Sequence, residues 1–497
     1  MIDLARGTEK DCSRPAAGRP AGDFGYGFNT VQDPVWTLSQ VLLATGGRFV
    51  SGSPEAKFRA ISTDTRALQP GDLFLALSGE NFDGRQFVRE AVRKGAAGII
   101  VSTMVEEPLP VPVILVADTL QALGDLAAYR RASMSSLQVI ALTGSSGKTT
   151  VKEMCAAILK EEYNVLKTEG NLNNQIGLPL TLLRVDASHD VAVLEMGMNR
   201  PGEIARMTEI ADPDIACIIN IQSAHLAGLH SIEGVARAKG ELFQGGKSWA
   251  KFCVNIDDKR VSALARQCSQ VQITFGRSRR AFVRATHVRN LGEEGMLFTL
   301  HIGSEKMRIS MRCLGDHNVS NALAAAAMAW AAGVKPAQIA QGLAHFTPYD
   351  KRLQMETVGG LKIINDCYNA NPSSMLAAFN TVRAMKKNRK SVAILGDMLE
   401  LGPESEAAHR RLGENAACKG FDYLFSCGQF SRKVVDGALH AGMTMKQAKQ
   451  AESKEEIVEA IVNLVALGEL REQDLLLVKG SRGMRMETII EQLRSRL

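Results

Sequence analysis

The stretch at 141–150 constrains the fold most, because it joins a strand, a glycine-bearing turn and a helix in that order. The apolar run at 137–142 has the character of a buried parallel strand, and residues 151–159 carry apolar side chains at helical spacing. The motif between them, Thr-Gly-Ser-Ser-Gly-Lys-Thr-Thr at 143–150, is typical of a phosphate-binding loop. The sequence therefore predicts a parallel, helix-covered sheet that binds a nucleoside triphosphate.

Each part of this loop has a chemical reason. The glycines allow backbone N–H groups to turn toward an anion, Lys148 can reach the outer phosphates, and Thr149 offers a hydroxyl to Mg²⁺. Leu142 stands where the strict pattern has a glycine, so the motif is a shortened variant. The alternative is a glycine turn that merely joins strand to helix beside a surface lysine. The expected nucleotide-binding residues here are Gly144, Ser145, Ser146, Gly147, Lys148, Thr149 and Thr150.

Composition limits the class of protein. A chain of 497 residues predicts two to three domains, and its net charge of +6 without a strong basic run does not suggest nucleic-acid binding. Its nine cysteines form no Cys-x-x-Cys pair, which favours reduced thiols. No apolar run reaches the ~20 residues of a membrane helix, and no apolar signal segment begins the chain. We expect a cytoplasmic protein without a membrane span.

The order of elements predicts an α/β protein with three domains. A helix at 119–131, with Thr119 as its expected N-cap, follows the first domain, and an alternating stretch at 285–311 predicts a small antiparallel appendage to the second. The last domain is Rossmann-like but lacks a Gly-x-Gly-x-x-Gly motif, so NAD is not implied. The expected units are a disordered extension at 1–34, a small α/β domain at 35–118, a central nucleotide-binding domain at 119–346 and a C-terminal domain at 347–497.

Polar residues follow the expected central strands. Glu195 ends the buried run at 191–195, where a carboxylate could hold Mg²⁺, although it could instead cap a helix or form an ion pair. His225 closes the next such segment and is equally compatible with a structural role. Asn318 and Asn321 lie three residues apart, hence on one helical face, where they could bind a base or simply cap the helix.

Taken in order, these motifs resemble those of the Mur ligases over residues 36–497. The resemblance rests on the motifs at 143–149, 195–197, 225, 238–243, 315–321 and 351–352. Three further segments resemble the corresponding segments of those family members that add D-alanyl-D-alanine to UDP-N-acetylmuramoyl tripeptide. They are Asn-Asp-Cys-Tyr-Asn-Ala-Asn-Pro-Ser-Ser-Met at 365–375, Gly-Asp-Met-Leu-Glu-Leu-Gly at 396–402 and Val-Lys-Gly-Ser-Arg at 478–482. The shortened glycine loop is the family's own form.

The resemblance implies an ATP-dependent ligase that activates a carboxylate as an acyl phosphate, and we expect a monomer. It implies Mg²⁺ at Thr149 and Glu195, and a second Mg²⁺ held by Glu195 or His225 together with a carbamylated Lys239. Without the resemblance, Lys239 would be interpreted as an exposed helical lysine. The implied catalytic residues are Lys148, Glu195, His225, Lys239 and Arg352.

The same resemblance implies binding roles. Asn318 and Asn321 would contact the adenine, and Asp366 the ribose, although Asp366 also suits an ordinary turn after a strand. The UDP end would lie against Thr65 and Arg66 in the N-terminal domain, where a surface ion pair is the alternative for Arg66. The muramoyl-peptide path would involve Asn173 and Asn174, and the D-Ala-D-Ala pocket would lie near Asn369 and Asn371.

Two other functions stay open at this point. One is a sister ligase that adds a diamino acid to UDP-muramoyl dipeptide, against which the segments at 365–375 and 396–402 argue. The other is a partner protein of cell-wall synthesis that binds ATP without catalysis. The presence of the whole implied catalytic set favours an enzyme over that second alternative.

Overall fold

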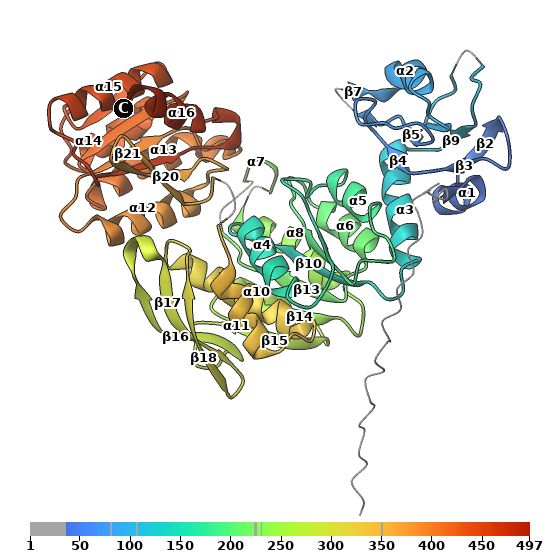
Figure 1. The fold of residues 1–497 in the computed structure, drawn as a ribbon, viewed down its shortest axis with the longest axis horizontal. Coiled ribbons are helices and arrows are strands. Elements are labelled where there is room, and N and C mark those ends of the chain that lie inside the picture. The colour runs from blue at the N-terminus through green and yellow to red at the C-terminus, as the bar shows by residue number, and fades with distance from the viewer. Residues whose placement is uncertain (1–35, 80–81, 106–107, 223–225, 230, 349–350) are drawn as a thin grey trace, which may run out of the picture.

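The computed structural model describes residues 36–79, 82–105, 108–222, 226–229, 231–348 and 351–497. It is an α/β protein with three sheet-based domains, and the central domain lies between the N-terminal and C-terminal ones (Figure 1). The expected disordered extension at 1–34 lies outside the described residues. The expected domain boundaries at 118 and 346 stay predictions.

The N-terminal domain is built on a five-stranded sheet in the order β2-β9-β8-β5-β4. Strand β2 is antiparallel to β9, and the other neighbours are parallel. The strands are β2 (Arg48–Ser51), β4 (Ile61–Ser62), β5 (Leu73–Leu75), β8 (Gly98–Val101) and β9 (Val113–Leu115), with the short pairs β1 (Trp36–Thr37) and β3 (Lys57–Phe58), and β6 (Ser78–Gly79) and β7 (Phe82–Asp83). The helices are α1 (Leu38–Thr45), η1 (Gly84–Phe87) and α2 (Val88–Arg93).

Helix α3 (Thr119–Ala132) connects this domain to the central one. It packs against α1 and against two helices of the central domain, α5 (Gly177–Leu182) and α6 (Glu203–Ala211). The prediction that Thr119 is its N-cap is wrong, because Asp118 has the extended backbone and the side chain that caps the helix. The Asp118 carboxylate accepts hydrogen bonds from the backbone N–H groups of Leu120 at 2.7 Å and Gln121 at 2.8 Å. The Thr119 hydroxyl instead accepts one from the backbone N–H of Ser78 at 3.1 Å.

We expect Asp118→Ala to lower the free energy of unfolding by about 1 kcal/mol, as loss of an N-cap usually does. The midpoint of urea unfolding measures this. It is followed by fluorescence in a background with Trp249→Phe and Trp330→Phe, so that the signal comes from Trp36, whose ring lies 5.9 Å from that of Tyr129 on α3. Asp118→Asn keeps an acceptor and is expected to unfold at the wild-type midpoint. Equal midpoints for the alanine and asparagine variants would contradict the capping role.

The central domain contains one nine-stranded sheet in the order β11-β12-β10-β13-β14-β15-β16-β17-β18. Its pairs are parallel from β11 to β16, and β16–β18 are antiparallel. The expected antiparallel appendage is therefore a continuation of the main sheet. The strands are β10 (Gln138–Thr143), β11 (Val165–Lys167), β12 (Val191–Glu195), β13 (Ile215–Ile218), β14 (Lys251–Asn255), β15 (Val271–Gly276), β16 (Val283–Asn290), β17 (Met296–Ile302) and β18 (Glu305–Met311).

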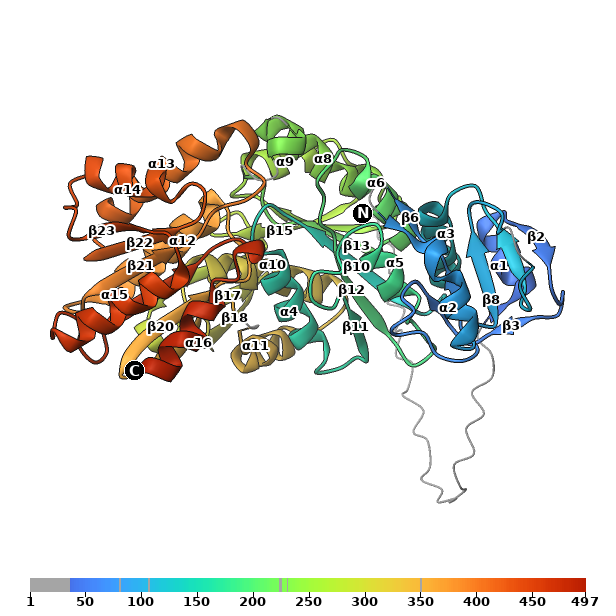
Figure 2. The ribbon, with the colours of Figure 1, turned by 90° about the horizontal axis from the view of Figure 1, so that it is seen from above.

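Helices cover both faces of this sheet, so its central parallel strands β10, β12 and β13 are mainly apolar (Figure 2). One face packs against α4 (Lys148–Leu159), α10 (His317–Ala331) and α11 (Pro336–His345). The other face packs against α6 (Glu203–Ala211), α8 (Ile232–Gln244) and α9 (Lys259–Ala265). The remaining elements are α5 (Gly177–Leu182), α7 (Leu226–Leu229) and η2 (Gly292–Glu294).

The C-terminal domain is a six-stranded sheet in the order β19-β20-β24-β21-β22-β23, parallel except for the edge strand β19. Helices α13 and α14 lie on one side of it and α15 and α16 on the other (Figure 2). The strands are β19 (Gln354–Val358), β20 (Leu361–Asp366), β21 (Ser391–Leu395), β22 (Tyr423–Cys427), β23 (Ala448–Ala451) and β24 (Leu475–Lys479). The helices are α12 (Pro372–Lys386), η3 (Gly402–Glu404), α13 (Ser405–Cys418), α14 (Ser431–His440), α15 (Lys454–Ala466), η4 (Arg482–Met484) and α16 (Glu487–Arg496).

The cysteines and the helices of the described residues bear on two predictions made from composition. The eight cysteines in this part of the chain are all free thiols, as expected. None of the helices in the described part of the chain combines the length and the apolar character needed to cross a bilayer.

Candidate active site

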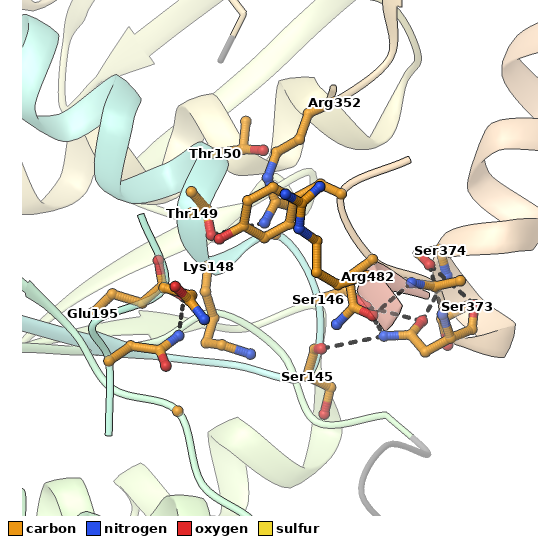
Figure 3. A pocket seen from close by; sticks show the side chains of 18 of the residues that line it. Ser145, Ser146, Lys148, Thr149, Thr150, Glu195, Arg352, Ser373, Ser374 and Arg482 are labelled. Carbon is orange, nitrogen blue, oxygen red and sulfur yellow. Dashed lines mark hydrogen bonds between the residues drawn. The ribbon is translucent and has the colours of Figure 1, made fainter. Parts of the chain in front are cut away.

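A cavity of about 1070 Å³ lies between the central and C-terminal domains (Figure 3). Its central-domain wall is formed by the loop between β10 and α4, the end of β12 and the start of α10. Its C-terminal wall is formed by residues that follow β20, β21 and β24. The cavity thus lies at the carboxyl ends of strands in both parallel sheets, where α/β proteins usually bind ligands.

The β10–α4 loop has the geometry of an anion cradle. Gly147 has φ +83°, and a Cβ there would lie 2.5 Å from Oδ1 of Asn321, so glycine is required for two reasons. The backbone N–H groups of Ser145 and Ser146 both donate to Oδ1 of Asn220, at 3.1 and 3.0 Å. An acceptor oxygen therefore already lies where these amides converge, which is the arrangement that a phosphate oxygen would also satisfy.

Lys148 begins α4 and folds back over the loop. Its Nζ donates to the backbone carbonyl of Gly144 at 2.9 Å. Burial lowers the pKa of Lys148, whereas the negative charge of Glu195 raises it and the positive charge of Arg352 lowers it further. A phosphate in the cradle would offset this desolvation, because it would place negative charge beside the ammonium group.

Glu195 ends β12 and is only 2% exposed. Its Oε1 accepts a hydrogen bond from Nδ2 of Asn173 at 2.8 Å, and its backbone N–H donates to Oγ1 of Thr168 at 3.0 Å. Among the described residues, its buried Oε2 has no hydrogen-bond partner. A buried carboxylate oxygen with unused acceptor capacity is costly unless a cation or donor meets it.

Lys239 lies on α8 and is fully buried, so the interpretation as an exposed helical lysine is wrong. Its Nζ finds no hydrogen-bond partner within the described part of the chain. Burial, with a smaller contribution from the charge of Lys148, lowers the pKa of Lys239 well below its usual value. His225, the other residue expected here, lies outside the described residues. Among the described residues, no three His, Cys, Asp or Glu side chains are grouped closely enough to hold a metal ion.

The C-terminal domain contacts the phosphate loop through two side chains. Arg352 donates from Nη2 to Oγ1 of Thr149 at 2.8 Å, and its guanidinium lies 4.0 Å from the centre of the Tyr368 ring (Figure 3). Asn371, the N-cap of α12, donates from Nδ2 to Oγ of Ser146 at 3.3 Å. An arginine and an amide from one domain therefore reach the loop of the other.

The two asparagines of α10 do not act as caps. Asn318 and Asn321 are buried, and Nδ2 of Asn321 donates to Oδ1 of Asn318 at 2.8 Å. Asn318 in turn donates to the carbonyl of Leu314 at 2.7 Å. On the opposite wall, the Asp366 carboxylate accepts a hydrogen bond from Nζ of the buried Lys479 at 2.6 Å, so Asp366 is more than an ordinary turn residue.

The cavity brings together most of the predicted residues. Those that line it are Ser145, Ser146, Gly147, Lys148, Thr149, Thr150, Asn173, Asn174, Glu195, Asn318, Asn321, Arg352, Asp366, Asn369 and Asn371. Gly144 and Lys239 do not line the cavity, but both interact with Lys148, which does. The carbonyl of Gly144 accepts a hydrogen bond from Lys148, and the charge of Lys148 affects Lys239. Asn174 also caps the turn before α5, where its Oδ1 accepts from the N–H of Gly177 at 2.8 Å.

Thr65 and Arg66 are not part of this cavity, because they follow β4 in the N-terminal domain. The Arg66 side chain is 87% exposed, and its Nη2 lies 2.7 Å from Oδ2 of Asp64. This is the surface ion pair that was the alternative to a role in binding. Hydrogen bonds from Arg66 lower the pKa of Asp64 to about 2. The carbonyl of Thr65 accepts a hydrogen bond from Nζ of Lys94 at 2.9 Å.

Several cavity residues did not enter the predicted site. Asn220 follows β13, Lys479 ends β24, and Glu400 follows β21. Asn220 and Lys479 are polar residues at or just after the carboxyl end of a buried parallel strand, which is the signal that identified Glu195. Applied to every strand, the same criterion would have found these two residues, but not Glu400, which lies five residues beyond the end of β21.

Comparison with known families assigns each domain. The Mur ligase family catalytic domain model matches residues 57–131, the Mur ligase middle domain model matches 142–329, and the Mur ligase glutamate ligase domain model matches 351–482. These matches fall on the three sheets described above.

Individual relatives agree over nearly the whole length. The chain is 36% identical to the UDP-N-acetylmuramoyl-tripeptide–D-alanyl-D-alanine ligase of Escherichia coli, over 92% of this chain and 98% of that protein. It is 38% identical to the ligase of the same name from Bacillus subtilis, over 87% and 92%. A crystal structure of MurF from Acinetobacter baumannii superimposes with a TM-score of 0.86 at 35% identity, covering 93% of this chain and 99% of that one. With three matching domain models and relatives of this similarity, the chain belongs to the Mur ligase family.

Proposed function

We propose that this protein is the ATP-dependent ligase that joins D-alanyl-D-alanine to UDP-N-acetylmuramoyl tripeptide in peptidoglycan precursor synthesis. The observation that supports it best is a single cavity in which Lys148 and Glu195 of the central domain face Arg352 and Asp366 of the C-terminal domain. Relatives of that name are 36–38% identical over most of the chain. A solved MurF from Thermotoga maritima, 26% identical with a TM-score of 0.78, is in complex with ADP.

The first step would transfer the γ-phosphoryl group of ATP to the terminal carboxylate of the tripeptide, which forms an acyl phosphate. The amides of Ser145 and Ser146 and the ammonium of Lys148 would bind the phosphates, and Arg352 would stabilise negative charge on the transferred group. The amine of D-Ala-D-Ala would then attack the acyl carbon and displace phosphate. Closure of the two domains around the cavity would limit the hydrolysis of such an intermediate.

The residues present fit a Mg²⁺ requirement. Thr149 offers a hydroxyl oxygen, and the buried Oε2 of Glu195 has no partner among the described residues, so both are suited to a hard cation. When bound, the ion would neutralise charge on the phosphates during transfer. Because Thr149 Oγ1 here accepts from Arg352, we propose that Arg352 exchanges this hydroxyl for a phosphate when nucleotide binds.

We propose that Lys239 is carbamylated and holds a second Mg²⁺, with Glu195 or His225 as the further ligand. Its pKa, lowered by burial, keeps a larger fraction of the amine neutral, and a neutral amine attacks CO₂ to form a C–N bond and release a proton. The product is an anionic oxygen ligand. The reaction would also convert a buried amine that has no hydrogen-bond partner among the described residues into a group whose oxygens a cation can meet.

The other binding roles follow the chemistry of each wall. Asn318 and Asn321 would contact the adenine and Asp366 the ribose, whereas Asn173 and Asn174 would line the peptide path. Asn369 and Asn371 would lie near D-Ala-D-Ala. Thr65 and Arg66 would contact the UDP end, which requires Arg66 to exchange Asp64 for a phosphate. We further propose a monomer in the cytoplasm, since one chain supplies every wall of the cavity and the nucleotide substrates are cytoplasmic.

Phosphate release from ATP tests the proposed function against both alternatives. The purified protein is assayed with Mg²⁺ and UDP-muramoyl tripeptide, with and without D-Ala-D-Ala, and in parallel with UDP-muramoyl dipeptide and diamino acids. We expect release that requires both tripeptide and D-Ala-D-Ala. Release only with dipeptide and a diamino acid would establish the sister activity, and nucleotide binding without turnover would establish a non-catalytic partner.

A further inference from the structure

Four carboxylates line the cavity: Glu195, Glu203, Asp366 and Glu400. Glu195 belongs to the central-domain wall beside the phosphate loop. Glu203 begins α6, and its Oε2 accepts from the backbone N–H groups of Asn199 at 2.7 Å and Arg200 at 3.2 Å. Asp366 is paired with Lys479 at 2.6 Å, so its charge is already balanced. Glu400 lies on the loop that follows β21 of the C-terminal domain, and it is exposed.

The backbone holds Glu400 in an unusual conformation. Its φ is +66°, in the left-handed region that non-glycine residues rarely adopt. A left-handed residue in the wall of a cavity is a candidate for a functional role. Fixed neighbours maintain it: the N–H of Leu399 donates to Oγ of Ser481 at 2.9 Å, and the Leu401 side chain is only 3% exposed. The backbone position from which the Glu400 side chain starts is therefore fixed by its neighbours.

A buried histidine supports the same loop. The N–H of Met398 donates to Nε2 of His409 at 2.9 Å, and Nδ1 of His409 lies 2.7 Å from the carbonyl of Ser405. This pattern requires the neutral tautomer with its proton on Nδ1. The imidazole stacks on the ring of Phe430, with 4.6 Å between the ring centroids. The loop that presents Glu400 is thus anchored at Met398 and Leu399.

Glu400 lines the same cavity as Lys148, so this cavity contains both a carboxylate of the C-terminal domain and the phosphate-loop lysine of the central domain. The amine that attacks the acyl phosphate must approach this same space, and it enters the cavity as a cationic ammonium group. An anionic side chain here would attract that group, and a carboxylate can take its proton.

We infer that Glu400 binds the ammonium group of the incoming amino compound and accepts its proton before attack. The inference rests on the proposed function. One proton passes from nitrogen to the Glu400 carboxylate, and the freed lone pair forms the C–N bond to the acyl carbon. The bond from that carbon to the phosphate oxygen then breaks, and the departing phosphate carries away the second proton from nitrogen. The products are the amide and inorganic phosphate.

Hydroxylamine separates this role from all earlier steps, because it is unprotonated at neutral pH and needs no base to attack an acyl phosphate. We compare Glu400→Gln with wild type for two products from ATP and UDP-muramoyl tripeptide: the amide with D-Ala-D-Ala and the hydroxamate with hydroxylamine. Glu400→Gln is expected to lower the amide rate by roughly 10²–10³-fold, as loss of a general base does. The hydroxamate rate is expected to stay within about twofold of wild type, and the amide rate to recover as pH rises.

Glu404→Gln is the matched control, since Glu404 lies four residues further along and forms an exposed ion pair with Arg411. It is expected to change neither rate. An equal loss of both products in Glu400→Gln, or an unchanged amide rate, would overturn the inference. Failure of the wild-type protein to form hydroxamate would instead overturn the proposed function. The hydroxamate rate of the variant also shows directly that it folds and binds ATP.

Discussion

Replacing Lys148 by methionine is expected to lower kcat by roughly 10²–10³-fold, the cost of removing one charge-stabilising group from a transition state. Methionine keeps much of the aliphatic chain but has no ammonium group to meet the transferring phosphoryl oxygens. The affinity for ADP should fall much less, because the loop amides and the N-terminus of α4 still face the phosphates. Steady-state phosphate release and calorimetric ADP binding measure the two effects.

Lys160→Met provides the control for the Lys148 variant. Lys160 is an exposed residue at the opposite end of the same helix and is expected to be replaceable without loss of rate. Should Lys148→Met retain a rate within threefold of wild type, the assignment of the loop lysine to phosphoryl transfer would be wrong. A loss of ADP binding as large as the loss of kcat would show that Lys148 serves binding in the ground state instead.

Replacing Lys239 by methionine is expected to lower kcat by about 10²-fold, because the proposed carbamate could no longer hold a metal beside the developing charge. Methionine has about the volume of lysine, so it should fill this fully buried position without disturbing the packing. The loss of activity should therefore come from the missing amine rather than from a change in structure. A second measurement isolates the carbamate. Wild-type enzyme kept in CO₂-free buffer is expected to lose activity and to regain it when bicarbonate is added.

Arg237→Met is the matched variant, since Arg237 lies on the same helix but is exposed. We expect it to keep both its rate and the wild-type response to bicarbonate. The carbamate proposal fails if Lys239→Met is as active as wild type and bicarbonate has no effect. It also fails if the methionine variant responds to bicarbonate as wild type does, because the response would then arise elsewhere.

Local pattern was sufficient for much of the fold. Strand β12 coincides with the buried run expected at 191–195, because buried parallel strands are short apolar runs bounded by polar residues. Pattern could not show how strands pair. The stretch at 285–311 alternates like any antiparallel unit. That alternation does not show that β16 also pairs with β15, through Phe275 and Val283, and so joins the main sheet.

Site residues were predictable from the sequence where they stand at the end of a buried strand. They were less predictable where their role depends on being buried by the rest of the fold. Lys239 shows the limit, because no local pattern distinguishes an exposed helical lysine from one that tertiary packing encloses. Asn220 shows another limit. Its side chain matters because it lies against the amides of Ser145 and Ser146, and those residues are more than seventy positions away in the chain. Such contacts follow from the arrangement of the sheet rather than from the spacing of residues.

The hydrogen bond from Arg352 to Thr149 has a thermodynamic consequence for ligand binding. Since it joins two domains, any ligand that uses the Thr149 hydroxyl must compete with the C-terminal domain for it. Linkage is reciprocal. If bound nucleotide changes the affinity for a ligand of the C-terminal wall by some factor, that ligand changes the affinity for nucleotide by the same factor. A nucleotide-site inhibitor would therefore change the affinity for the amino substrate even when the two compounds never touch.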